Sequence, residues 1–409
     1  MKLSLVGRSA LALMAASALG LGITGCGGGT VAYLWTIGQQ YNQISGFKVD
    51  DFTGNLTQIP HQPFPAAGSN PVSIVVKPGG RYVYVLNQGA LPSTCDPKNP
   101  QLCQTHWTGG NVAVFSVGGD GTLTLQNTYV TQGYKSTWMQ MDTTGQYLYV
   151  LDQYSPSGDG NGAISSYSSD PATGRLTLVQ NTQGATGGQP ALNYFEVGSK
   201  TALYPGPFMS KTAGNCLFVA TPNNIVPFAI NGGQLLTPSQ AGTYTGTNIT
   251  SITGNSNYVL VTDAAAQTVT QYTSSNCALQ PVSGGTYHTS KFAAGNPVYT
   301  LIDNSNQYVY VLLNNNNNNT TANSTIVAYR ILNGQLQPIA GAGYGAGAGA
   351  NCMVEDPTGQ YVYVSNYNDG TISGFLFDNT TGNLSSLTRG STFTATGQLT
   401  CLALSGNVD

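Results

Sequence analysis

Charged residues are scarce in this chain of 409 residues. Asp, Glu, Lys and Arg together make up 7% of it, with 13 basic and 16 acidic side chains. Lys2 and Arg8 belong to a leader described below, and without them 11 basic residues face 16 acidic ones. A mildly acidic chain has no basic surface for phosphates, so we expect no nucleic-acid partner. Hydrophobic residues still make up 40%, which is enough for a core and argues against disorder.

Groups that titrate near neutral pH are also few. The chain has three histidines, His61, His106 and His288, and two glutamates, Glu196 and Glu355. It contains no G-x-S-x-G elbow, no H-E-x-x-H pair and no Gly-rich phosphate loop between a strand and a helix. The common serine hydrolase, zinc protease and nucleotide sites are therefore not predicted, and we expect no cofactor.

The chain has no apolar run long enough for a stable transmembrane span. The longest candidate, residues 10–23 (ALALMAASALGLGI), follows Lys2 and Arg8 and is typical of a secretory signal. It ends in ITGC, which resembles the bacterial lipobox, whose Cys is diacylated. We predict a signal peptide over 1–25, a lipidated Cys26 with a tether over 26–30, and a location in the bacterial cell envelope, periplasmic or at the cell surface. The alternative is an ordinary signal peptide with a chance cysteine.

Residues 31–409 repeat one pattern seven times. Its apolar core appears as VAYLWT, YVYVLN, YLYVLD, CLFVAT, YVLVTD, YVYVLL and YVYVSN, beginning at residues 31, 82, 147, 216, 258, 308 and 361. Each copy precedes a second alternating run, a turn rich in Gly or Asn, and a short third run such as GTLTLQ. Another strand, such as NCMVEDPTG, comes before most copies. Four antiparallel strands per repeat predict an all-β fold, a seven-bladed β-propeller.

The two ends of the chain predict how the ring closes. Before Val31 there is no room for an innermost strand, whereas LTCLALSGNVD at the C-terminus matches an innermost strand and then stops. The C-terminal strand should therefore join the N-terminal blade, so that no sheet edge stays open.

Six cysteines remain once Cys26 is assigned to lipid, an even number in an oxidising compartment. Cys95 and Cys103 share one loop, and Cys352 and Cys401 occupy the same position on neighbouring innermost strands. Cys216 starts a second strand, and Cys277 lies at the turn between the third and fourth strands of the next blade. We predict these three disulfides, with buried free thiols as the alternative. The predicted pairs are Cys95–Cys103, Cys352–Cys401 and Cys216–Cys277.

Connection lengths distinguish two faces of the predicted ring. Turns between the first and second strands, and between the third and fourth, share one face and are short; we call it the plain face. All other connections share the opposite, elaborated face, which carries the insertions at residues 88–110, 153–162, 183–204, 284–296 and 314–324. Loops vary where binding occurs, so this face is the candidate functional surface. The tether from Cys26 spans at most about 18 Å, which predicts that the plain face lies toward the membrane.

The repeat GANCMVEDPTGQYVYVSNYNDGTISGFLFDNTTGNLSSL resembles that of the YVTN and lactonase-like seven-bladed propellers, which include 6-phosphogluconolactonase-like proteins. The resemblance covers residues 31–409 and rests on structural positions such as Tyr361, Val362 and Gly359. It implies a lactone hydrolase, with a histidine before a P-x-G-R turn and with Arg and Glu beside it. The matching segment here, residues 70–85, has Arg81 but no histidine.

A substitute site is conceivable on the elaborated face, where all three histidines and Glu196 are expected in connections. A general base needs a titratable group and a partner that orients it, so His106 or His288 with Glu196 and Lys200 is the candidate constellation. The alternative is that they are solvated loop residues on separate blades.

Metal binding is a weaker possibility. Asp152, Asp159 and Asn161 place oxygen atoms in a Gly-rich loop that could hold Ca²⁺, although the spacing fits no standard loop and turn formation explains the same residues. Asp142, Asp303 and Asp356 recur before a tight turn, which predicts capping of the backbone.

Two functions stay open. One is a membrane-anchored, monomeric binding propeller that uses the elaborated face for a protein or glycan, with Trp107, Tyr154 and Tyr287 as available aromatics. The other is a lactonase with an altered site, acting on a lactone ligand at the same face.

Overall fold

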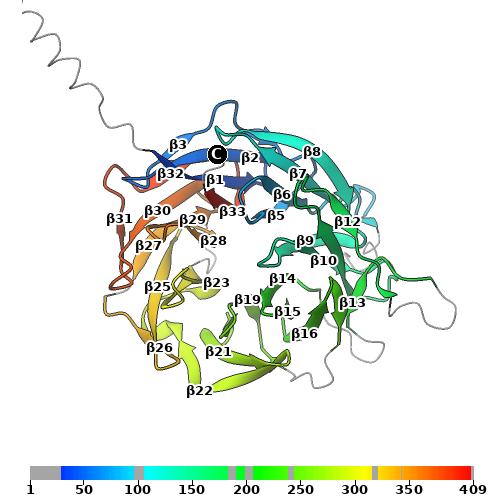
Figure 1. Ribbon diagram of the computed structural model, residues 1–409. Coiled ribbons are helices and arrows are strands. Elements are labelled where there is room, and N and C mark those ends of the chain that lie inside the picture. Colours follow the sequence, from blue (N-terminus) through cyan, green and yellow to red (C-terminus); the bar gives the residue numbers. More distant parts are fainter. Residues whose placement is uncertain are drawn as a thin grey trace, which may run out of the picture.

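The computed structural model describes residues 29–95, 106–182, 190–198, 206–237, 244–315, 321–341 and 343–406. These residues form seven antiparallel sheets arranged as blades around a central axis (Figure 1). The prediction of an all-β, seven-bladed propeller is confirmed. The signal peptide, Cys26, Cys103 and Lys200 lie outside the described residues.

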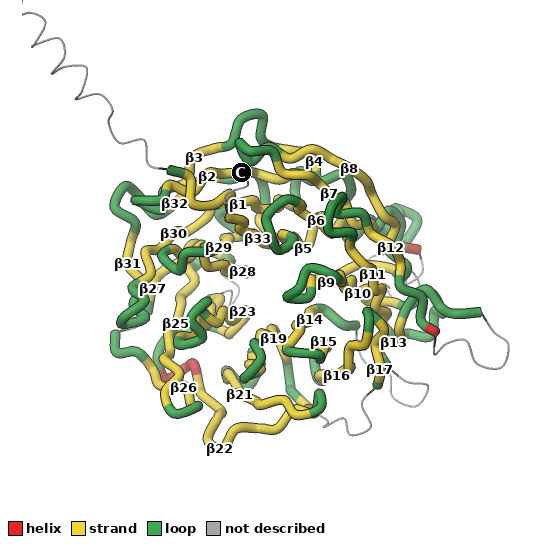
Figure 2. The backbone as a smooth tube through the Cα atoms, in the orientation of Figure 1, coloured by secondary structure: helices red, strands yellow, loops and turns green. Residues whose placement is uncertain are grey.

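Each blade is built outward from a strand beside the axis (Figure 2). The innermost strands of blades 1 to 7 are β33 (Leu399–Gly406), β5 (Pro71–Val76), β9 (Tyr134–Met141), β14 (Met209–Ala213), β19 (Ile249–Gly254), β23 (Asn296–Ile302) and β28 (Ala350–Glu355). The second strands are β1 (Thr30–Gly38), β6 (Tyr82–Asn87), β10 (Tyr147–Tyr154), β15 (Cys216–Thr221), β20 (Val259–Asp263), β24 (Tyr308–Asn314) and β29 (Tyr361–Asn366). The third strands are β2 (Gln43–Asp50), β7 (Asn111–Val117), β11 (Gly162–Ser169), β16 (Asn224–Asn231), β21 (Thr268–Ser275), β25 (Asn323–Leu332) and β30 (Thr371–Phe377).

The fourth, outermost position is continuous in two blades and divided in five. It is continuous in β8 (Leu123–Val130) and in β22 (Ala278–His288), which is followed by the short helix η3 (Thr289–Lys291). In the other blades two short strands pair in turn with different parts of the third strand. These are β3 (Leu56–Gln58) with β4 (Phe64–Pro65), β12 (Leu176–Leu178) with β13 (Phe195–Val197), β17 (Gln234–Leu236) with β18 (Tyr244–Thr245), β26 (Gln335–Pro338) with β27 (Tyr344–Ala348), and β31 (Leu384–Ser386) with β32 (Thr392–Thr394).

The C-terminal strand closes the ring as expected. β33 pairs antiparallel with β1, with Leu34 opposite Leu404 and Trp35 opposite Ala403 (Figure 1). This pairing joins residues about 370 positions apart and leaves β1 with a partner on both sides. The first blade therefore contains both ends of the described chain.

Buried side chains fill each junction between neighbouring blades. A separate apolar cluster occupies each one; that between blades 2 and 3, for example, contains Tyr84, Val112, Met139 and Leu148. The YVYV strands are buried on both faces, and Tyr361, Val362, Tyr363 and Val364 are all at most 1% exposed. Burial of alternate residues against opposite neighbouring blades explains why these segments are apolar throughout rather than alternating with polar residues.

The aromatic residues of the second strand also bond to the next blade. Tyr361 and Tyr363 of β29 donate to the carbonyl oxygens of Asp51 and Gly54, at 3.2 and 2.5 Å, in the turn between β2 and β3. Three other junctions repeat this contact, which we call the aromatic latch. The equivalent donors are Tyr33 and Trp35, Tyr82 and Tyr84, and Tyr308 and Tyr310.

Each latch requires a glycine in the turn that receives it. Gly54 has a φ of +68°, and a Cβ there would overlap the ring of Tyr361. Gly121, Gly174 and Gly382 are the equivalents, each with positive φ and an aromatic ring against its Cα. Only glycine combines this backbone with such close approach, so the T-G-N-L and T-G-R-L segments belong to the latch.

Two of the three predicted disulfides are confirmed, and the pairing of Cys95 with Cys103 stays a prediction. Cys216 bonds to Cys277 and Cys352 to Cys401, with Cα atoms 5.4 and 5.2 Å apart. Cys95 is disulfide-bonded, while its predicted partner lies outside the described residues. Disulfides of this kind indicate an extracytoplasmic, oxidising location. In the described part of the chain, no helix has the length and hydropathy needed to span a membrane.

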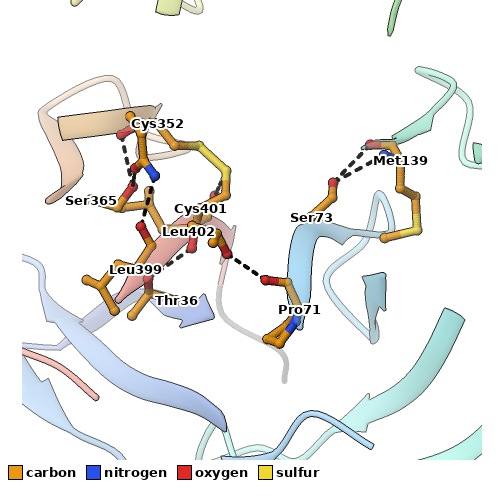
Figure 3. Close-up of a disulfide and its surroundings, with 11 residues drawn as sticks. Thr36, Pro71, Ser73, Met139, Cys352, Ser365, Leu399, Cys401 and Leu402 are labelled. Carbon is orange, nitrogen blue, oxygen red and sulfur yellow. Dashed lines mark hydrogen bonds between the residues drawn. A yellow bond between two sulfur atoms is a disulfide. The ribbon is translucent and has the colours of Figure 1, made fainter. Parts of the chain in front are cut away.

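The Cys352–Cys401 disulfide lies beside a set of hydrogen bonds between innermost strands (Figure 3). Thr400 donates to the carbonyl of Pro71 at 2.8 Å, and Asn351 donates to that of Leu399 at 2.9 Å. Thr137 and Thr250 make the equivalent bonds to the carbonyls of Pro207 and Pro297. These bonds link adjacent blades around the axis.

Candidate binding site at the elaborated face

The proposed catalytic residues lie on different blades. His106 precedes β7 of blade 2, Glu196 lies in β13 of blade 3, and His288 ends β22 of blade 5. Both histidines are exposed, and Glu196 is half-buried. The expectation that they lie in connections was wrong for Glu196 and His288, because both pair in outer strands, with Ala163 and Thr268. No contact among the three is found in the described residues.

His61 is also misplaced by the sequence prediction. It lies between β3 and β4, in the break of the outer strand of blade 1, with a φ of +62°. The connection that holds it is therefore a break within one outer position rather than an insertion on the elaborated face. Such a break was not visible in the sequence because both halves pair with the same strand, β2.

The suggested Ca²⁺ ligands form local backbone contacts instead. Asp159 accepts hydrogen bonds from the backbone N–H and side-chain amide of Asn161, at 3.0 and 3.1 Å, and from Ser155. The Asp152 carboxylate accepts hydrogen bonds from Gly133 and Ser136 instead. Across the described ranges, no three His, Cys, Asp or Glu side chains are grouped as a metal site would require.

The capping prediction for the plain face is confirmed. Asp303 and Asp356 each accept backbone N–H bonds from the residue that precedes the next strand and from the first residue of that strand, at 2.6–2.8 Å. Asp142 accepts one from Tyr147 at 2.8 Å. Since these carboxylates are engaged with the backbone, the recurring Asp maintains the turn rather than binding a ligand.

A cluster of aromatic residues lies instead on the elaborated face of blades 2 and 3. Lys135 holds its ammonium over the ring of Trp107, with Nζ 5.4 Å from the ring centroid. Its neighbour Tyr134 begins β9 and pairs with Tyr154, the last residue of β10. All four side chains are half-buried. We call Trp107, Tyr134, Lys135 and Tyr154 the mouth cluster.

Backbone bonds hold Trp107 in place. The next residue, Thr108, exchanges two hydrogen bonds with Ala90, at 2.8 and 3.0 Å, across the two arms of the insertion between β6 and β7. Lys135 has a φ of +54°, a conformation that L residues adopt rarely. Burial lowers the pKa of the Lys135 ammonium, and burial likewise raises the pKa of the Tyr154 hydroxyl.

Asp152 stabilises the backbone segment that carries Tyr134 and Lys135. Its carboxylate is fully buried and accepts hydrogen bonds from the backbone N–H of Gly133 at 2.8 Å and from Ser136 Oγ at 2.6 Å. Burial raises its pKa to about 6, against the opposing effect of these two bonds. Gly133 and Ser136 bracket Tyr134 and Lys135, so Asp152 positions the cluster through the backbone.

Two further aromatics lie close to the axis of the ring. Trp138 of β9 packs against three junction clusters, those between blades 1 and 2, 3 and 4, and 4 and 5. Tyr299 of β23 likewise packs against three. Side chains that touch clusters on several sides of the ring must lie close to its axis. The sequence placed these two residues in strands, but it did not show that both side chains lie close to the axis of the ring.

Of the aromatics expected on this face, Tyr287 has a structural role. Its ring packs on Tyr329, and its hydroxyl accepts the backbone N–H of Leu336 at 2.8 Å. Trp107 and Tyr154 remain as binding candidates. Lys135 and Tyr134 were missed, since their only sequence signal was their place at the start of an innermost strand.

The fold and the disulfides define a class: an extracytoplasmic seven-bladed β-propeller. The family model for lactonases of the seven-bladed β-propeller type matches residues 101–289 and 261–400, and the chain belongs to that family. No curated protein matches the chain.

Solved structures share the fold at low sequence identity. A periplasmic gluconolactonase of Pseudomonas aeruginosa is 14% identical, with a TM-score of 0.68 over 92% of this chain and 100% of that one. A Bacteroides fragilis protein described as a candidate 6-phosphogluconolactonase is 16% identical, with a TM-score of 0.68 over 93% and 99%. A Lactobacillus plantarum protein is 15% identical, with a TM-score of 0.68 over 92% and 100%.

Proposed function

We propose that this chain is an envelope-anchored binding propeller that recognises a glycan at the mouth cluster. The observation that carries the proposal is the pairing of Lys135 with Trp107 beside Tyr134 and Tyr154. Sugar rings pack their C–H faces on aromatic rings, and an ammonium adds a hydrogen-bond donor for hydroxyl groups or a charge for a sugar acid. The candidate acids and bases, by contrast, lie on separate blades.

A glycan-binding screen of the purified chain tests this function. Replacing Trp107 with Ala should weaken binding of any glycan found by about tenfold or more, since an aromatic contact contributes about 1.4 kcal/mol or more. Tyr41→Ala is the matched control, because Tyr41 is an exposed aromatic (56%) on the same face of blade 1. Equal affinity of the Trp107 variant and the wild type would refute the proposal.

Lactone hydrolysis is the second candidate, supported by the family match over residues 101–400. It predicts that the wild-type chain opens aldonolactones, measured by release of acid at constant pH. We would then measure lactone hydrolysis in three single variants, to test whether these dispersed residues contribute to the reaction: His106→Ala, His288→Ala and Glu196→Ala. Loss of activity in any single variant would favour the lactonase over the binding propeller.

We also propose that Cys26 carries the lipid. The support is the lipobox-like ITGC segment and the disulfides, which fit an envelope location. Incorporation of labelled fatty acid should be lost in Cys26→Ser. With the protein on intact vesicles, a thiol probe should label Thr108→Cys on the elaborated face faster than Thr143→Cys on the plain face; equal labelling would contradict the orientation.

A further inference from the structure

Phe52 is held in solvent at the plain face. It lies in the turn at residues 51–55, which joins β2 to β3, and its side chain is 87% exposed, more than any other large hydrophobic side chain in the described ranges. The turn is braced from blade 7, because Tyr361 and Tyr363 donate hydrogen bonds to carbonyl oxygens within it. A braced turn keeps the phenyl ring in water, where exposure of apolar surface is unfavourable.

Two other blades contain the same turn without an aromatic residue. The three segments are DDFTGN at residues 50–55, DPATGR at 170–175 and DNTTGN at 378–383. In each, the carboxylate of the first residue accepts hydrogen bonds from the backbone N–H groups of the third and fourth residues and from the hydroxyl of the fourth, at 2.6–3.3 Å. The third residue is exposed in every case and is Phe52, Ala172 or Thr380. Since Ala and Thr form the same turn, the turn does not account for the phenylalanine.

Blade 1 differs from blades 3 and 7 in holding the N-terminal tether. The carbonyl of Gly29 accepts the backbone N–H of Asp51 at 3.0 Å, so the tether lies directly against the turn that carries Phe52. Cys26 is three positions before Gly29, and a fully extended chain of that length spans at most about 11 Å. A lipid on Cys26 would therefore enter a bilayer no farther than this from the turn, which brings the exposed ring to the membrane surface.

We propose that Phe52 inserts into the lipid bilayer beside the lipid anchor and fixes the plain face against the membrane. This inference rests on the proposed lipidation of Cys26. A phenyl ring gains free energy when acyl chains replace water around it, but one ring is too small to hold a protein on a membrane alone. The acyl chains supply attachment, and Phe52 limits rotation of the propeller about its tether. Asp51 beside it is exposed and acidic, so the contact should be stronger on an uncharged bilayer than on an anionic one.

Tryptophan emission at position 52 tests the insertion. The chain beginning at Cys26 is coupled through that cysteine to a maleimide-bearing phospholipid and bound to phosphatidylcholine vesicles, which supplies the anchor whether or not cells add one. We expect the emission of Phe52→Trp, after subtraction of the wild-type signal, to shift to the blue on these vesicles and to be quenched by brominated acyl chains. Tyr41→Trp on the elaborated face should show neither change, and Ala172→Trp, at the equivalent position of blade 3, should be quenched less.

Partitioning into vesicles measures how much the contact contributes. With a single short acyl chain coupled to Cys26, membrane binding is weak and reversible, so a second contact changes the bound fraction. Phe52→Ala should weaken partitioning into phosphatidylcholine vesicles about tenfold or more, because the apolar ring is no longer transferred from water to lipid. Thr380→Ala is the matched control in the equivalent turn of blade 7 and should leave partitioning unchanged. Both variants should melt like the wild type, since both side chains are exposed.

Any of three results would overturn the proposal: unchanged emission of Phe52→Trp on vesicles, equal partitioning of Phe52→Ala and the wild type, or equal quenching of Phe52→Trp and Ala172→Trp. The last would mean that the whole plain face contacts the membrane without a special role for Phe52. Absence of fatty acid on Cys26 in cells is a separate result. It would refute the lipidation proposal, whereas the measurements with coupled lipid would still report on Phe52.

Discussion

Between blades 7 and 1, Tyr361 and Tyr363 reach across to the turn after β2, whereas between blades 4 and 5 the residue at the position of Tyr361 is Cys216. Cys216 bonds to Cys277, which lies in the turn between β21 and β22, the equivalent turn of the next blade. The disulfide thus takes the place of the aromatic latch. The same position of the repeat therefore contacts the next blade at both junctions. The contact is a hydrogen bond from Tyr361 at one junction and a disulfide of Cys216 at the other.

Turn length explains which junctions carry a latch. The receiving turns of blades 1, 2, 3 and 7 have five or six residues, at 51–55, 118–122, 170–175 and 378–383. Those of blades 4, 5 and 6 have two, at 232–233, 276–277 and 333–334. A two-residue turn does not extend far enough to offer carbonyls to an aromatic pair. At the three short-turn junctions the turn is contacted differently: Ser166 donates to the carbonyl of Gly233 at 2.7 Å, Cys216 forms a disulfide with Cys277, and Gln271 donates to the carbonyl of Gly334 at 3.1 Å.

The largest effect is expected at the junction held by the disulfide. Replacing Cys216 and Cys277 with Ala together should lower the free energy of unfolding by about 4 kcal/mol, since the bond closes a long loop with a sequence separation of 61. Urea denaturation measures it. A loss below about 1 kcal/mol would mean that packing alone secures this junction and that the disulfide does not replace the latch.

A latched junction should be sensitive to its glycine. Gly54→Ala forces a side chain into positive φ and against the Tyr361 ring, so we expect a loss of about 3 kcal/mol. Gly232→Ala is the matched variant at a short-turn junction. It has a similar φ of +56° but open space around the new Cβ, and should cost about 1 kcal/mol. Thermal melts of the pair compare them, and equal losses would show that backbone conformation alone matters.

The junction between blades 6 and 7 should make the free energy of unfolding depend on pH. Glu355 accepts the backbone N–H of Asn304 at 2.6 Å, and burial, with Asp303 and Asp356 nearby, raises its pKa to about 8. Its ordinary pKa is 4.5, so the unfolded chain loses this proton first and stability should fall as pH rises from 4.5 to 8. Allowing for partial exposure, the fall is about 2 kcal/mol. Denaturation at several pH values should show it in the wild type but not in Glu355→Gln.

The smallest pair of effects concerns the tyrosine hydroxyls. Tyr363→Phe removes the hydrogen bond to Gly54 and should cost about 1 kcal/mol. Tyr149→Phe removes a buried hydroxyl that has no partner and should leave stability unchanged or slightly higher. Urea midpoints of the two variants test this directly. A loss at Tyr149 as large as that at Tyr363 would contradict the distinction between latched and unlatched junctions.

Much of the fold was predictable because its signals are local or repeated. Alternating runs, turn residues and the unmatched segment at residues 399–406 led to blades, ring closure and the Cys352–Cys401 and Cys216–Cys277 pairs. The divided outer strands were not predicted, since pieces of two to five residues carry too little periodicity. For the same reason Glu196, in the three-residue strand β13, was assigned to a connection. His288 was assigned to a connection as well, although it is the last residue of the continuous strand β22.

The candidate sites were much less predictable. Trp107 was singled out as an aromatic in a loop, but its contact with Lys135 crosses from one blade to the next. The acids and histidines chosen for their chemistry proved to be spread over three blades.

By itself, the sequence determined the number of blades, the way the ring closes and two disulfides, because each depends on spacing along the chain. The tertiary structure alone decided which turns receive an aromatic latch and that Trp107 contacts Lys135. Those properties depend on distances between blades. A repeated sequence pattern does not show how the contacts of one blade differ from those of another.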